Sequence, residues 1–228
     1  MTSLLKTSLL LTFSLFFAST FNAEAGKKKV KISVSERDAE IFVNGNMIGK
    51  GTALIIIPAY TDASVEIVKT GFLTEEITFF NTPGNPSPPK TYHVKMSIDD
   101  AYEASTQTDI ANIDLEIKTT KNQDDAWLLL NRIILSYIDV IEVTDKETSY
   151  LRTAWEVKSF SKATIRTRVI VKLGDKIDAN HVSYKLKLIS EYAKGAGISP
   201  KEDQAFKEWD RVLRKYEAIV SELPSRMK

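Results

Sequence analysis

Apolar and polar residues alternate through most of the first half of the chain, which is the pattern of half-buried strands. The alternation runs from Val30 to Ile98 and is interrupted by Pro58 and by the segment 81–90, which holds four prolines and a glycine. We therefore predict an all-β domain over residues 26–98 and no helix within it. Residues 53–57 (ALIII) form a continuous apolar run, which predicts a strand buried on both faces.

Asn44-Gly45 separates two of these alternating runs within the segment 39–49. Asparagine and glycine accept a positive φ more easily than other residues, and a type I′ turn requires a positive φ at both central positions. The pair therefore predicts a tight β-hairpin.

The pattern changes after residues 99–109, which lack strong periodicity and are interpreted as a linker that could hold a short helical turn. The segment 110–228 then reads β-α-β-β-β-α. Asn122 or Asp124 can cap the first helix, and Pro224 is expected to end the last one. The strands are expected at 113–117, 149–159, 164–173 and 183–192, the first helix buries Trp127, Leu130, Ile134, Tyr137 and Ile138, and the last buries Phe206, Trp209, Leu213, Tyr216, Val220 and Leu223.

Short connections between successive strands favour an antiparallel sheet, and both helices need an apolar surface to cover. We therefore predict an α+β domain in which two helices pack on the inner face of one sheet, the helix-grip arrangement. Leu151, Thr153, Trp155 and Val157 are assigned to that inner face by alternation. All three tryptophans are expected in the core.

The first residues resemble an export signal. Lys6 precedes the apolar run 8–18, and Ala23-Glu24-Ala25 is an A-x-A site, which predicts cleavage after Ala25 and a signal peptide over 1–25. The apolar run falls short of the roughly 20 residues that a spanning helix needs, so no transmembrane segment is expected after cleavage. A periplasmic or secreted location follows.

Composition narrows the possible chemistry. The chain has no cysteine, which excludes disulfides, thiolate metal sites and a lipid anchor on a cysteine. The net charge of +1 favours no global attraction to nucleic acid. The two histidines, His93 and His181, have no motif partner, and no phosphate-binding or hydrolase motif occurs. We expect neither an enzyme nor a cofactor.

The first half resembles the PEGA domain, a small all-β module of bacterial envelope and surface proteins. The matching features are Ala39–Val43, the Asn44-Gly45 turn, Met47-Ile48-Gly49, Pro58, the strand Val65–Lys69 and Gly71-Phe72. At the tetrapeptide that names the family the chain has Glu36-Arg37-Asp38-Ala39, so only alanine agrees. The resemblance covers about residues 30–80 and implies a non-catalytic role.

The second half is similar in element order to the helix-grip domains of the lipoprotein C subunit of the outer-membrane barrel assembly machinery. Tyr150–Trp155 followed by Arg166–Val169 prompts the comparison. The absence of cysteine is incompatible with such a lipoprotein, so the resemblance implies a fold only.

Basic residues gather on the predicted outer face of the second sheet. Arginine suits the recognition of carboxylate or phosphate, which makes this face a candidate docking surface for an envelope protein or an anionic envelope polymer. The alternative is a solvated face on which Asp114 and Glu116 pair with these residues. The candidate binding residues are Arg152, Lys158, Arg166, Arg168, Lys172, Lys185 and Lys187, with Glu156 as the accompanying acid.

The expected function is therefore non-enzymatic binding or scaffolding in the bacterial cell envelope. A carrier of a small apolar ligand, held between the terminal helix and the sheet, is the alternative. An envelope hydrolase with dispersed carboxylates is a third reading. The sequence leaves the ligand and the oligomeric state open.

Overall fold

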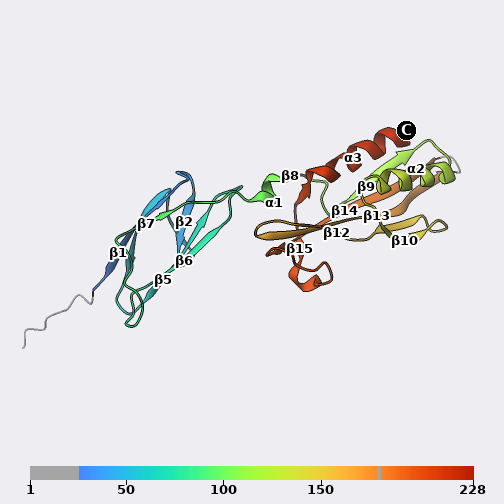
Figure 1. Ribbon diagram of the computed structural model, residues 1–228. Coiled ribbons are helices and arrows are strands. Elements are labelled where there is room, and N and C mark those ends of the chain that lie inside the picture. Colours follow the sequence, from blue (N-terminus) through green and yellow to red (C-terminus); the bar gives the residue numbers. More distant parts are fainter. Residues whose placement is uncertain (1–25, 179–180) are drawn as a thin grey trace, which may run out of the picture.

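The computed structural model describes residues 26–178 and 181–228, and its strands fall into two groups along the chain (Figure 1). Buried apolar side chains form two clusters with no residue in common, one between Val30 and Met96 and the other between Ala101 and Met227. The protein is mostly β, its sheets are largely antiparallel and its last element is a helix, as predicted. The predicted signal peptide and its cleavage site at Ala25 lie outside the described residues.

The first group of strands forms two sheets that share the first cluster. One has the order β4-β1-β7 and the other the order β3-β2-β5-β6. Neighbouring strands are antiparallel except β1 and β7, which run parallel with Lys31 opposite Thr91. The strands are β1 (Lys28–Val34), β2 (Glu40–Val43), β3 (Asn46–Lys50), β4 (Thr52–Ile57), β5 (Asp62–Val68), β6 (Glu75–Phe80) and β7 (Thr91–Val94).

The predicted hairpin turn joins β2 to β3. Asn44 and Gly45 have φ values of 50° and 79°, so both central residues adopt the positive φ that the turn type requires. The Asn44 side chain also accepts a hydrogen bond from the Ser64 backbone N–H at 2.9 Å, which ties the turn to β5. The turn prediction is confirmed.

The prediction that residues 53–57 are buried on both faces is wrong. Ala53, Ile55 and Ile57 point into the cluster, whereas Leu54 and Ile56 are 57% and 53% exposed. A continuous apolar run carries no information about which face another layer covers, and nothing covers the outer face of β4 in the described part of the chain.

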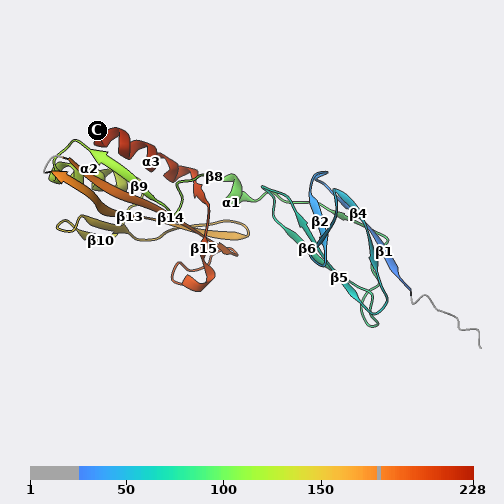
Figure 2. The same ribbon diagram turned by 180° about the vertical axis from the view of Figure 1, so that it is seen from behind.

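The second group of strands forms a seven-stranded sheet with the order β10-β11-β13-β14-β15, to which β12 adds beside β13 and β9 beside β14. Both long helices, α2 and α3, pack on one face of this sheet. Figure 2 shows them from the side opposite to that of Figure 1. Asn122 is the N-cap of α2. The elements are β9 (Asp114–Thr119), α2 (Gln123–Leu135), β10 (Ile141–Asp145), β11 (Tyr150–Thr153), β12 (Glu156–Ser159), β13 (Ala163–Asp178), β14 (His181–Lys194), β15 (Lys207–Glu208) and α3 (Arg214–Met227).

The order β-α-β-β-β-α holds only in outline. The strand β10 was not predicted, and the terminal helix begins at Arg214, so Phe206 and Trp209 precede it. Between the one-turn helix η1 (Asp203–Ala205) and α3 the chain forms β15 and then β16 (Arg211–Leu213), which pairs with β8 (Ser105–Gln107). Pro224 lies inside α3, near its end, and does not stop it.

The predicted strand 149–159 is two strands, because Ala154 interrupts the pleat. Arg152 pairs with Ile170 of β13, but Glu156 pairs with Thr167, so one extra residue lies between the two strands and the register shifts by one. Leu151 and Thr153 face the core as predicted. Val157 then pairs with Arg166, so Trp155 and Val157 fall on the outer face and the assignment of both to the core is wrong.

The predicted linker, residues 99–109, contains α1 (Asp100–Glu103) and β8. Its start bonds to both groups of strands. The Asp99 N–H donates to the Gly71 carbonyl at 3.0 Å, while the Asp100 carboxylate accepts 2.9 Å hydrogen bonds from the Ser161 N–H and hydroxyl. The guanidinium of Arg211 is buried against Tyr102 and Ser105. These bonds hold residues 97–105, which we name the connector, against both groups.

Replacing Asp100 with alanine is expected to speed hydrogen exchange at the Ser161 amide, because that amide loses its acceptor. Burial opposes ionisation of Asp100, but the hydrogen bonds from Ser161 outweigh it, so the pKa of this carboxyl is lowered from its usual 3.8. The protection of the Ser161 amide against exchange is therefore present above pH 3.8, and it is lost as the pH falls through the lowered pKa of Asp100. An Asp109→Ala control should leave Ser161 unchanged, and equal protection in the Asp100 variant would contradict the expectation.

Candidate functional site

The outer face of the seven-stranded sheet brings together six of the seven predicted binding residues. Lys158 is the exception. It pairs with Ile165, whose side chain is in the core, so after the break at Ala154 it lies on the helix side of the sheet together with Glu156. Glu156 there forms an ion pair with Lys215 of α3. The grouping of Glu156 and Lys158 with the outer-face arginines is wrong.

Arg166 lies on the outer face, yet it is 4% exposed. Its Nε and Nη1 atoms donate at 2.6 Å to Glu191 and to Asp203, and Nη1 donates at 2.6 Å to the Pro200 carbonyl. Its guanidinium also lies 4.2 Å from the ring centres of both Trp155 and Phe206. Two carboxylates and a carbonyl thus satisfy Arg166, which anchors the segment 198–206 to the sheet.

Arg168 differs from Arg166 in having no carboxylate partner in the described part of the chain. Its guanidinium lies 3.9 Å from the centre of the Trp155 ring, the same ring that Arg166 contacts. Its Nε atom is buried and has no hydrogen-bond partner among residues 26–178 and 181–228. Burial, and secondarily the charge of Arg152, lower the pKa of Arg168. An anion bound at the accessible part of the guanidinium would offset both effects on the pKa.

Two lysines extend the positive charge along the sheet. Lys172 of β13 lies directly opposite Lys185 of β14, and neither has an ion-pair partner in the described residues. Like charges directly opposite each other on one face destabilise a strand pair. We name Arg168, Lys172 and Lys185 the open basic cluster.

The remaining predicted residues on this face are neutralised. Arg152 donates to Glu142 at 3.0 Å, and Lys187 lies 3.5 Å from Asp114. Glu116, which is opposite Lys185, pairs at 3.8 Å with Lys118 of its own strand. The alternative of a solvated ion-pair face therefore describes Arg152 and Lys187, but it does not extend to the open basic cluster.

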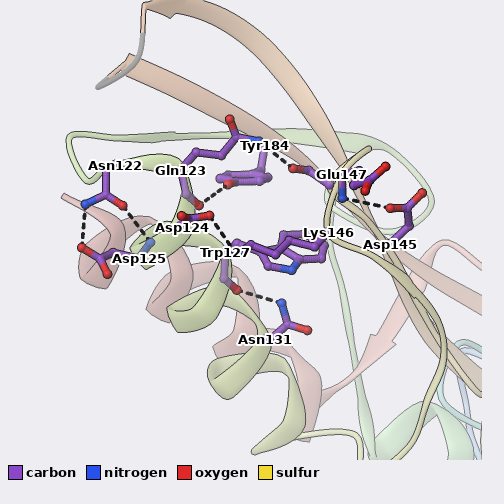
Figure 3. A network of polar contacts seen from close by, with 11 residues as sticks. Asn122, Gln123, Asp124, Asp125, Trp127, Asn131, Asp145, Lys146, Glu147 and Tyr184 are labelled. Carbon is purple, nitrogen blue, oxygen red and sulfur yellow. Dashed lines mark hydrogen bonds and ion pairs between the residues drawn. The ribbon is translucent and has the colours of Figure 1, made fainter.

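A second polar network surrounds the start of α2 (Figure 3). The Asn122 side chain accepts from the Asp125 N–H at 2.9 Å and donates to the Asp125 carboxylate at 2.7 Å, while Asp124 pairs with Lys146 at 3.0 Å. Trp127 stacks on Tyr184 with ring centres 6.1 Å apart. Each acidic side chain has a local partner, so the network caps the helix. Among the described residues no group of three potential metal ligands comes together.

The space between α3 and the sheet, where a carried ligand was the alternative, is occupied by side chains. Tyr216, Ile219, Leu223 and Met227 are at most 1% exposed and belong to the same cluster as the core residues of β13 and β14. Burial raises the pKa of the Tyr216 hydroxyl, with Glu156 as a secondary cause. Nothing in this packing favours a carrier.

Trp155 is the residue of the candidate site that alternation placed on the wrong face. It joins Arg166 to Arg168, since each guanidinium stacks on its ring. Arg166 and Arg168 are two residues apart on β13, so they share a face of the sheet. An aromatic ring on the neighbouring segment that stacks on both had to lie on that same face, and this was the signal in the sequence. Comparison with known proteins adds no family, because no family model and no curated protein matches the chain.

Proposed function

We propose that the protein is a non-enzymatic binding or scaffolding protein of the bacterial cell envelope that recognises an anionic protein or polymer through the open basic cluster. The observation that carries the proposal is Arg168, which is stacked on Trp155 and keeps a buried Nε donor without a partner. Natural proteins rarely leave such a donor unsatisfied. An anionic group on the ligand would give the Arg168 guanidinium the counter-charge that it lacks among the described residues.

The spacing of the cluster favours an extended ligand over a single small anion. Arg168 and Lys172 are four residues apart on β13, which corresponds to about 13 Å along a strand. One carboxylate or phosphate can contact both only if the two side chains bend toward each other, whereas a chain with repeated anionic groups can contact both as they stand. Within this proposal, residues 26–98 form a PEGA-like domain, residues 110–228 form the helix-grip-like domain that carries the cluster, and export is by cleavage after Ala25.

The first test is binding of fluorescently labelled poly-L-glutamate, followed by anisotropy at physiological salt. Arg168→Glu should weaken binding by about tenfold or more, because it removes a charge-assisted hydrogen bond and adds a like charge. Lys185→Glu should act in the same direction. Arg166 is unsuitable for this test, since its charge is already used within the fold.

Lys90→Glu is the matched control, because it makes the same charge change at an exposed residue of the first group of strands. Its affinity should stay close to that of the unchanged protein. If Arg168→Glu and Lys90→Glu bind the polymer equally well, the open basic cluster is not the binding site.

A further inference from the structure

The strand β4 has one edge that no other strand of the described residues covers. It is the end strand of the sheet β4-β1-β7, so only its other edge pairs, with β1. Its sequence, TALIII, contains no charge, proline or glycine. Unpaired edges are templates for pairing with another chain, and natural proteins usually protect them with charges, prolines, bulges or short length.

Other end strands of the described sheets carry such protection. β7 has four residues and β15 has two. β3 pairs through a bulge and ends in Gly49-Lys50, and β10 also pairs through a bulge. Three end strands carry charges. β6 contains Glu75 and Glu76, β9 contains Asp114, Glu116 and Lys118, and β10 contains Glu142 and Asp145. Against these, β4 stands out as an edge left open for pairing.

The outer face of β4 also exposes two large aliphatic side chains, Leu54 and Ile56, each more than half accessible. They lie opposite Lys31 and Lys29 of β1. Burying the part of both side chains that is still exposed would favour association. An added strand with apolar residues at the facing positions would cover Leu54 and Ile56. It would also form hydrogen bonds with the unpaired backbone N–H and C=O groups of the open edge.

We propose that β4 pairs antiparallel with β4 of a second copy of this chain, with Ile55 on the twofold axis. In that register Leu54 faces the partner's Ile56 and Ile56 faces the partner's Leu54. The pairing is self-complementary because β4 carries no charge, so no like charges come into opposition. Gly51 and Pro58 bound the strand at its two ends. Because Thr52 would face the partner's Pro58 in this register, the paired segment is limited to the five residues 53–57 of each strand.

The neighbouring lysines do not prevent this pairing. Lys31, Leu54 and the partner's Ile56 and Lys29 occupy four successive strands. Three steps of about 4.8 Å place the two ammonium groups about 14 Å apart. That separation exceeds the Debye length of about 8 Å at physiological ionic strength, so their repulsion is largely screened.

Two strands paired over five residues each bury little area, so the dimer belongs to the weak class of interfaces. We expect a dissociation constant in the micromolar range or weaker. Sedimentation velocity between about 1 µM and about 500 µM protein should show a shift from monomer to dimer. Ile56→Lys should remove the shift, because it places a charge at the facing position. Leu128→Lys, which changes a similarly exposed residue on α2, should leave the shift intact.

Cross-linking tests the register directly, since the chain has no cysteine of its own. A mixture of Leu54→Cys and Ile56→Cys proteins should form more disulfide dimer than either protein alone. Directly opposite Cβ atoms are about 5 Å apart, whereas diagonal ones are about 7 Å or more apart. Monomer at every concentration would overturn the proposal. A dimer that is lost in Leu128→Lys but kept in Ile56→Lys would also overturn it. The same holds if the protein does not associate in solution but binds anionic phospholipid vesicles in a way that depends on Ile56.

Discussion

Replacing Arg166 with methionine is expected to lower the free energy of unfolding by about 2–4 kcal/mol. The substitution keeps most of the apolar stem but leaves Glu191, whose side chain is 20% exposed, without its cation. It also removes the hydrogen bonds to Asp203 and Pro200 and the stacking on Trp155 and Phe206. The effect stays below that of a fully buried pair, because Asp203 remains solvated. Urea unfolding followed by circular dichroism measures the change.

Arg152→Met is the control for this measurement. Arg152 also lies on the outer face and pairs with a glutamate, yet its side chain and that of Glu142 are 34% and 49% exposed. Exposed pairs of this kind contribute about 0–1 kcal/mol. Equal losses in the two variants would mean that burial of Arg166 adds nothing, which would contradict its assignment as the anchor of the segment 198–206.

Replacing Gly51 with alanine should be the most damaging small substitution in the first group of strands. Gly51 has a φ of 64°, and an added Cβ would lie 2.8 Å from the Arg37 Cα and 2.9 Å from the Arg37 carbonyl carbon. Backbone atoms cannot move aside as a flexible side chain can. Gly51 also donates to the Ala39 carbonyl and accepts from the Val34 N–H, both at 2.8 Å. Left-handed strain and the clash together predict a loss of about 2–5 kcal/mol.

Gly45→Ala separates strain from the clash. Gly45 has a φ of 79°, but no atom lies within 4 Å of the position that an added methyl group would take. The conformational cost alone is about 1–2 kcal/mol. Thermal unfolding should therefore rank the unchanged protein above Gly45→Ala and Gly45→Ala above Gly51→Ala. If the Gly51 variant is as stable as the Gly45 variant, the backbone at Arg37 moves away from the added methyl group without a loss of stability.

The sequence correctly predicted those parts of the fold that depend only on neighbouring residues. The Asn44-Gly45 turn, the Asn122 cap and the apolar stripe of α2 follow from neighbouring residues. The structure contains all three, except that Tyr137 and Ile138 of the predicted stripe follow the end of α2 at Leu135. The alternation of Ile165, Val169 and Val171 likewise places them in the core. These features require only short-range rules, so a single sequence is enough to find them.

Features that depend on distant residues were missed. The chain before α3 has helical spacing at Phe206 and Trp209, but β15 pairs with β14 there, and β16 then pairs with β8, more than a hundred positions earlier. Arg166 was expected in solvent because alternation cannot show that Asp203 and Phe206 fold over it. Trp155 was misplaced by one interruption at Ala154, since a shift of one residue exchanges the faces of all that follow.

The parallel pairing of β1 with β7 has a mechanical consequence. These are the first and last strands of their group, and the pairing runs from Lys31 opposite Thr91 to Val34 opposite Val94. Because the strands are parallel, the chain enters β1 at one end of the pair and leaves β7 at the other. A pull between the segment before β1 and the connector therefore loads this ladder in shear, and its hydrogen bonds resist together instead of opening one at a time.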